Sequence, residues 1–375
     1  MNKHVRKLAE SQTMFSAKEL AGKFSFDGLA TCAFGVETGA LDEEESEFYR
    51  HGKNVLNITK LTMLKMVVNF LTPNAVKKLA AYLGIHNLFT YAFLNEHNKF
   101  LIHVVEESFK QRKESKIKRN DLLDMMITAI EGNLEAKDEN DIHASDQFAK
   151  DAKLENHVRQ RNLSYDDIIA TALLMLSAGY DTTGTTMAWI MYDLAVNPNC
   201  QETLFEEIMD AGGSDVDEIP YETLQTLPYL DAVIHETMRI HPLVPVLERM
   251  CTKDYKLPGS NLVIKKGEFV RLNSIGISLD PEVYPNPLEY NPDNFTKERH
   301  LNRNPYSFLG FSIGPRNCLA MRFAMYEMKV CISNLVSKFR FLPCDKTITN
   351  LELSLIHISE PTSRYAISYA VFCLK

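Results

Sequence analysis

The segment FSIGPRNCLA, residues 311–320, decides the fold of this 375-residue chain. Its Gly314 and Pro315 predict a loop. Apolar residues that follow at helical spacing predict a helix over residues 319–339. The loop would deliver Cys318 to the start of this helix, where unpaired amides and the positive end of the helix dipole stabilise a thiolate.

Several uses are open to Cys318. A cysteine in this position can act as a nucleophile, a redox sensor or the single axial ligand of a haem, and it is often no more than a small buried side chain. A haem needs only one protein ligand, which fits a chain with no second ligand nearby. Arg316, two residues upstream, could pair with an anionic group of such a cofactor.

The composition is that of a globular protein. The chain has 41 Lys and Arg against 49 Asp and Glu, a net charge of −8, and 45% hydrophobic residues. This charge argues against a nucleic-acid-binding protein, whose surface should be basic. The seven cysteines are scattered without a CxxC or zinc-like spacing, which is typical of isolated thiols in a reducing compartment. We interpret the basic run between Lys110 and Arg119 as a solvated helix end.

A long apolar helix is predicted from Ser164, which can cap the amide of Asp167, to Val196. Its length would be about 48 Å, enough to cross a whole domain. The alternative is a membrane span over residues 168–192, but that segment would place Asp181 and several Gly and Thr residues in hydrocarbon. We therefore favour a helix buried inside the protein.

Signals for β-structure come late in the chain. Short strands are predicted at residues 255–257, 262–264 and 269–272, separated by Pro-Gly and Lys-Gly turns. Helical patterns dominate elsewhere. The predicted fold class is mainly α with a minor β part.

Two further motifs are weak when taken alone. The segment AGYDTT, residues 178–183, could let a flat ligand approach the backbone and could pass protons from an acid to a hydroxyl. A Thr hydroxyl there can also bond to an earlier carbonyl, so a polar kink in a packed helix is the alternative. Glu236 and Arg239 are spaced i,i+3, which predicts an ion pair of a kind found in many helices.

In this order along the chain, the acid–Thr motif, the Glu-x-x-Arg pair and the F-x-x-G-x-R-x-C loop resemble the cytochrome P450 superfamily. The resemblance extends to LERMC at 247–251, the Pro-rich run at 280–292 and the continuation of the loop to Ala324. These segments are similar to the clan of vertebrate drug-metabolising and arthropod detoxification enzymes. The resemblance runs from about residue 10 to about residue 352.

The resemblance implies a haem site built on the loop. Cys318 would be the proximal thiolate ligand of haem b (iron protoporphyrin IX), and Phe311 would shield its sulfur. Gly314 would belong to the haem-binding loop, and Arg316 and Arg249 would bind the haem propionates.

The resemblance also implies roles outside the loop. Asp181 and Thr182 would deliver protons to dioxygen, with Ala178 and Gly179 leaving room above the haem. Glu236 and Arg239 would tie their helix to the Pro-rich stretch. The family usually has an Arg at the position of Asn294, which would complete a triad with these two residues. Here the tie would be weaker or made differently. Ser312 and Ala320 stand where glycine is common.

The implied activity is that of a haem-thiolate monooxygenase, which inserts one oxygen atom of O₂ into an apolar small molecule. Electrons would come from NADPH through a flavoprotein reductase, at the cytoplasmic face of the endoplasmic reticulum membrane. Contact with a membrane surface is implied for the full-length protein, and no nucleic-acid partner is expected. One alternative is a non-catalytic haem-binding or sensing protein, and another is an inactive fragment.

We expect two regions along the chain. Residues 1–352 would form a partial cytochrome P450 domain that lacks the N-terminal anchor and first helices, so that the fold is incomplete at both ends. Residues 353–375 resemble the translation of a transposase-type sequencing-library adapter, with one mismatch at Ser363. The other interpretation of this segment is a native C-terminal hairpin.

Overall fold

The computed structural model describes residues 1–11, 14–41, 46–55, 96–115, 118–130, 164–212, 219–347 and 370–374. The chain divides into two compact units, which we describe separately. Unit 1 comprises residues 22–138 and 158–184 together with Met1, and unit 2 comprises residues 2–21, 139–157 and 185–375.

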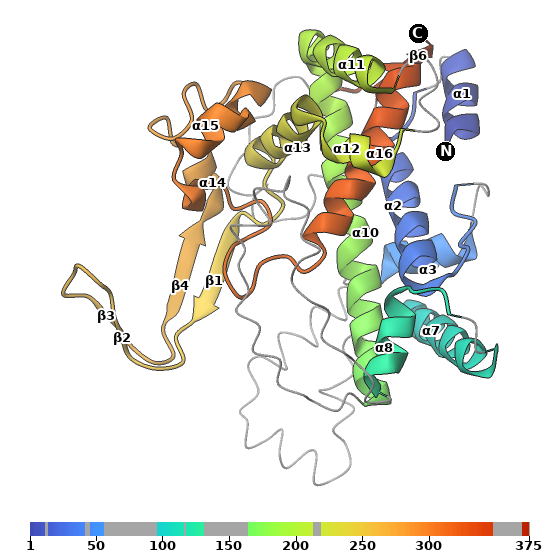
Figure 1. Ribbon diagram of the computed structural model, residues 1–375, viewed down its shortest axis with the longest axis horizontal. Helices are drawn as coiled ribbons and strands as arrows, with labels where there is room; N and C mark the ends of the chain where they lie inside the picture. The colour runs from blue at the N-terminus through green and yellow to red at the C-terminus, as the bar shows by residue number, and fades with distance from the viewer. Residues whose placement is uncertain are drawn as a thin grey trace. The chain divides into compact units, whose positions relative to one another are not determined.

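Helices account for most of the described residues, as predicted (Figure 1). The α-helices are α1 (Asn2–Glu10), α2 (Ala17–Phe34), α3 (Glu47–Asn54), α7 (Glu96–Ser115), α8 (Leu122–Ile130), α10 (Tyr165–Val196), α11 (Pro198–Gly212), α12 (Tyr221–Gln225), α13 (Pro228–Ile240), α14 (Ser274–Ser278), α15 (Lys297–Leu301) and α16 (Met321–Lys338). Two 3₁₀ helices, η3 (Pro292–Phe295) and η4 (Pro305–Ser307), precede the Cys318 loop. The strands are β1 (Val246–Met250), β2 (Tyr255–Lys256), β3 (Val263–Ile264), β4 (Phe269–Asn273), β5 (Phe339–Pro343) and β6 (Ala370–Leu374).

The long helix predicted from the sequence is α10, which has 32 residues. Its start is a capping box, because Ser164 Oγ accepts a hydrogen bond from Asp167 N at 3.2 Å and the Asp167 carboxylate accepts one from Ser164 N at 2.9 Å. Its end precedes Pro198, and Asn197 Nδ2 donates to Asp193 O at 2.8 Å. Within the described ranges, no helix is long and apolar enough to cross a membrane.

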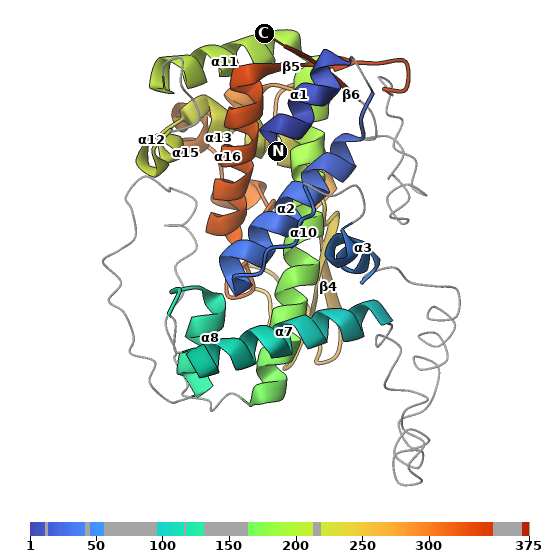
Figure 2. The same ribbon diagram turned by 90° about the vertical axis from the view of Figure 1, so that its right-hand side faces the viewer.

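Unit 1 is built around aromatic contacts between its helices. Phe26 of α2 is fully buried and meets the ring of Tyr180 edge-on, with the ring centroids 5.2 Å apart. Helix α7 lies across the N-terminal part of α10 (Figure 2), where the rings of Phe109 and Tyr165 are 5.1 Å apart. Apolar burial on these faces holds the helices together without a sheet in the described part of unit 1.

Unit 2 combines helices with small antiparallel sheets. Gln201 of α11 holds β5, since its Nε2 donates to Phe341 O at 3.1 Å and its Oε1 accepts from Phe341 N at 2.8 Å. Helix α13 starts where the carboxylate of Glu207 accepts hydrogen bonds from the amides of Tyr229 and Leu230, at 2.7 and 2.9 Å. This carboxylate supplies the cap that the helix start needs.

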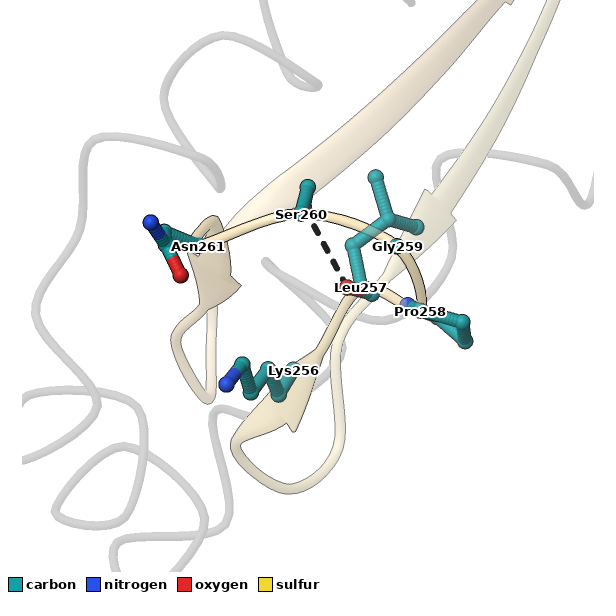
Figure 3. A pocket seen from close by; sticks show the side chains of 6 residues that line it. All are labelled: Lys256, Leu257, Pro258, Gly259, Ser260 and Asn261. Carbon is teal, nitrogen blue, oxygen red and sulfur yellow. Dashed lines mark hydrogen bonds between the residues drawn. The ribbon is translucent and has the colours of Figure 1, made fainter.

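The strands of unit 2 form pairs. β1 pairs with β4 in the register Arg249↔Val270, β2 pairs with β3, and β5 pairs with β6. The predicted strands correspond to β2, β3 and β4, whereas β1 and β5 were not predicted. The β2–β3 turn holds a shallow hollow, across which Ser260 Oγ donates to Leu257 O at 3.2 Å (Figure 3). The residues that line it include none of the predicted site residues.

Candidate functional site

The Cys318 loop, residues 308–320, joins η4 to α16 in unit 2. Cys318 N donates to Phe311 O at 2.8 Å, and Asn317 N donates to Gly314 O at 3.0 Å, which closes the loop on itself. Gly314 and Ser312 both have positive φ, 79° and 58°. Gly314 suits this conformation, whereas Ser312 pays a modest strain in a place where the family commonly has glycine.

The loop leaves three different chemical groups uncovered. Cys318 and Arg316 are exposed when each residue is taken as a whole, and Phe311 is half-buried. Leu319 is 82% exposed, which is unusual for a large apolar side chain. A thiol, a cation and an apolar surface side by side in sequence fit a haem, which offers iron, carboxylates and a flat apolar ring. The residues of the loop are therefore compatible with the implied cofactor.

The expected thiolate is not favoured by the loop itself. Partial burial raises the pKa of the Cys318 thiol, and a hydrogen bond from the Ala320 backbone opposes this only in part. Helix α16 begins at Met321, so the cysteine lies before the first helical turn rather than in it. The direction of this pKa shift therefore does not support the expectation that the helix start stabilises a thiolate.

Arg249 lies on β1, in the same unit as the loop. Its side chain is exposed, and its Nη1 donates to Glu248 O at 2.9 Å. The pairing of β1 with β4 fixes the backbone at this position. The side chain is thus accessible to an anionic group.

Glu236 and Arg239 form the predicted ion pair at the end of α13. Arg239 Nε donates to Glu236 Oε2 at 2.7 Å, and Arg239 Nη2 donates to Oε1 at 2.8 Å. Both side chains are completely buried. Arg239 Nη1 also donates to the carbonyls of Ser278 and Pro287, at 2.8 and 2.7 Å. The predicted tie between α13 and the Pro-rich stretch is confirmed by these contacts.

Asn294 keeps a contact with this pair although it carries no charge. It is buried, and its Nδ2 donates to Glu236 Oε1 at 3.2 Å. The same carboxylate oxygen accepts from Asn291 N at 2.8 Å. Glu236 therefore has hydrogen-bond donors around it, but only Arg239 among these residues brings positive charge.

Tyr284, which sequence reasoning missed, lies at the centre of this region. It is fully buried, and its hydroxyl donates to Ser307 O at 3.2 Å, next to the start of the Cys318 loop. The guanidinium of Arg239 lies 5.0 Å from its ring centroid. An aromatic residue inside the Pro-rich stretch was the only signal for this residue in the sequence.

The acid–Thr motif lies on α10 in unit 1. Thr182 Oγ1 donates to Ala178 O at 2.7 Å, so the predicted bond to an earlier carbonyl is confirmed. Ala178 and Thr182 are exposed, and Asp181 is half-buried. Gly179 faces α2 instead, where an added Cβ would lie 2.7 Å from Leu29 Cδ2. Close helix packing thus accounts for this glycine, which the sequence pattern had assigned to space for a flat ligand.

The fold and the loop together define a mainly α protein with a cysteine presented ahead of a long helix. The cytochrome P450 family model matches residues 1–368, and the chain belongs to this family.

The chain is similar to several insect members of the family. It is 31% identical to cytochrome P450 6k1 of Blattella germanica over 338 residues, which cover 90% of this chain and 62% of the relative. It is 32% identical, with the same coverage, to probable cytochrome P450 6a13 of Drosophila melanogaster. The chain therefore spans 62% of the length of these relatives.

Proposed function

We propose that this chain is part of a haem-thiolate monooxygenase that inserts one oxygen atom of O₂ into an apolar small molecule. The observation that carries the proposal is the Cys318 loop, which leaves a thiol, an arginine and a leucine uncovered. Membership of the cytochrome P450 family supports the same assignment.

Haem b would be held by residues of unit 2. Cys318 Sγ would ligate the iron after losing its proton, because metal ligation requires the thiolate. Arg316 and Arg249 are exposed cations suited to the propionate carboxylates. Phe311 would shield the sulfur, and Gly314 leaves the surface of the loop open, since a Cβ there would meet nothing within 4 Å. When bound, the haem supplies the binding and activation of dioxygen.

Asp181 and Thr182 would move the protons that oxygen reduction consumes. Asp181 is half-buried, so water can reach its carboxylate. Thr182 is held by its bond to Ala178 O, which fixes the direction of its hydroxyl. Ala178 is small and exposed, so it leaves room beside them.

The partners follow from the same assignment. Electrons would come from NADPH through a flavoprotein reductase, and the exposed apolar side chains of Val244 and Val246 suit an apolar substrate. The full-length protein would work at the cytoplasmic face of the endoplasmic reticulum membrane. These assignments are supported by resemblance to the family.

The proposal is tested by oxygen consumption of the purified chain with NADPH and a flavoprotein reductase. We expect turnover that depends on both, and a fall of about 100-fold or more in product formed when Asp181→Asn or Thr182→Ala removes the proton donor. Thr203→Ala is the matched control, because exposed Thr203 on α11 makes the same kind of bond, from its Oγ1 to Asn199 O. A chain that binds haem but consumes no oxygen would instead favour a non-catalytic haem protein.

A further inference from the structure

The buried ring of Tyr284 has two guanidinium groups close to it. The Cζ atom of Arg239 is 5.0 Å from the ring centroid, and the Cζ atom of Arg303 is 4.2 Å from it. Arg303 also lies 5.3 Å from the ring centroid of Phe295. The shorter of the two distances to Tyr284 belongs to Arg303, a residue that no sequence motif singled out.

Arg303 is also bonded to the backbone of Asn294, where the family usually has arginine. Its Nη2 donates to Asn294 O at 2.7 Å. The Asn294 side chain in turn donates to Glu236 Oε1 at 3.2 Å. Arg303, nine residues further along the chain, therefore places its guanidinium against the backbone of position 294.

We propose that Arg303 supplies the second cation of the buried cluster formed by Glu236, Arg239, Tyr284 and Asn294, in place of an arginine at 294. The cluster then contains two guanidinium groups around one aromatic ring and one carboxylate. Arg303 would play this part whatever the substrate of the enzyme.

The chemistry of arginine suits this position. Its planar guanidinium can stack on an aromatic face and donate in its own plane at the same time, which a lysine ammonium cannot do. A cation–π contact is strongest where water is excluded, and Tyr284 is fully buried. Burial lowers the pKa of Arg303, while Tyr284 and Glu236 oppose this effect, and arginine stays charged at neutral pH.

The position of Arg303 gives it an influence on the Cys318 loop. Tyr284 donates to Ser307 O at 3.2 Å, and Ser307 ends η4, directly before the loop. Arg303 lies two residues before the start of η4. By fixing the ring of Tyr284 from one side, Arg303 acts as a positioning residue for the segment that carries Cys318.

A charge-relocation experiment tests the proposal. Arg303→Gln removes the cation, Arg303→Lys keeps the charge without the planar group, and Asn294→Arg with Arg303→Gln returns the cation from the other position. Arg299→Gln is the matched control, because Arg299 is exposed and donates to the side-chain oxygen of Asn294, at 3.3 Å, rather than contacting the ring of Tyr284. Each variant is made in the full chain, and its thermal unfolding is followed at one fixed scan rate.

We expect Arg303→Gln to lower Tm by about 3 to 6 °C and Arg303→Lys to lower it by less. Asn294→Arg alone should also lower Tm, because the site is already filled. The double variant should regain most of the loss, whereas Arg299→Gln should shift Tm by about 1 °C or less. Losses that simply add in the double variant would overturn the proposal. If the single variants yield no folded protein, the yield of soluble protein replaces Tm as the measurement. Recovery of soluble protein in the double variant would support the proposal, and no recovery would overturn it.

A second readout separates positioning from simple stabilisation. Haem-loaded protein is reduced and bound to CO, and the fraction that shows the strongly red-shifted Soret band of thiolate ligation is measured. Arg303→Gln should reduce this fraction, and the double variant should restore it. An unchanged fraction in Arg303→Gln would contradict the positioning role. A chain that binds no haem would count against the proposed function alone, since the unfolding measurements would still test Arg303.

Discussion

The thiol of Cys318 keeps its proton until a metal ion replaces that proton on the sulfur. Burial raises its pKa, so the folded loop favours the protonated form. Haem binding would then release a proton, and the apparent haem affinity of the chain should rise with pH. The loop geometry, with Cys318 N bonded to Phe311 O, keeps the cysteine in place for ligation before any cofactor arrives.

Alkylation of the haem-free chain by iodoacetamide tests this state of Cys318. Because only the thiolate reacts, the rate at Cys318 should stay below that of the free thiol of a cysteine in a short unstructured peptide at pH 8.5 and keep rising at more alkaline pH. Peptide mass spectrometry would resolve this cysteine from the other six. Faster reaction at Cys318 than at the free thiol would show that the loop lowers the pKa.

Individual residues differ in how far the sequence could predict them. The Glu236–Arg239 pair and the Thr182 bond to Ala178 O were predicted, because both depend on spacing within one helix. Tyr284 and Arg303 were not, because their contact joins segments that only the tertiary fold brings together. Arg112, in the basic run interpreted as solvated, is buried between Asp121 and Asp124. A run of basic residues in the sequence does not reveal which of them will be buried by an ion pair with acidic residues elsewhere in the chain.

Close packing between helices α2 and α10, rather than room for a ligand, explains why position 179 is a glycine. A Cβ at this position would lie 2.7 Å from Leu29 Cδ2, so α2 approaches α10 closely at this point. We expect Gly179→Val to lower the free energy of unfolding by about 1 to 3 kcal/mol through overpacking. Ala170→Val, on the exposed surface of the same helix, should change it by about 0.5 kcal/mol or less.

Combining Gly179→Val with Leu29→Ala tests whether the contact between these two side chains causes the loss of stability. If Leu29 is the obstacle, the double variant should lose less stability than the sum of the two single variants. Urea denaturation at one pH would measure all four proteins. Additive losses would mean that the two side chains do not meet.

A histidine pair links α3 to α7. Nδ1 atoms of His51 and His97 are 3.0 Å apart, and the His51 ring stacks on Phe100 with centroids 4.2 Å apart. Burial lowers the pKa of His51, with further contributions from His97 and Arg50, while Glu47 and Glu96 oppose the shift. The folded state therefore prefers neutral His51.

Protonation should weaken this contact. Since the folded pKa is lowered, the stabilisation is complete above the unfolded value of about 6.5 and is lost as the pH falls below it. We expect the free energy of unfolding to drop more between pH 7.5 and pH 5.5 in the native chain than in His51→Gln. An equal or larger drop in the variant would contradict the sign of the shift.

Regular elements were predicted where periodicity or capping was strong. Helix α10 has the predicted capping box and length, and β2, β3 and β4 correspond to the predicted strands. β1 was missed because its sequence, VLERM, places two charged residues side by side and shows no alternation of apolar and polar residues. The last helix begins at Met321 instead of residue 319, because the end of the Cys318 loop takes up the two residues before it. Helix ends depend on such local turns.

The predicted boundary after residue 352 concerns the whole molecule. If residues 353–375 derive from an adapter, a chain that ends at residue 352 should unfold within about 2 °C of the longer one, because that segment would have no evolved packing. A fall of several degrees would indicate a native strand. Removal of β6 would then uncover β5, in which Phe339 and Phe341 are completely buried. Differential scanning calorimetry on the two chains would decide.

The central claim is that Cys318 ligates a haem iron through its sulfur. The most direct measurement is the absorption spectrum of the reduced, CO-bound chain, compared with those of Cys318→Ala and of Cys32→Ala, an exposed cysteine in unit 1. We predict that the native chain and Cys32→Ala show the strongly red-shifted Soret band of thiolate ligation and that Cys318→Ala lacks it. A Cys318→Ala variant that retains this band would contradict the account.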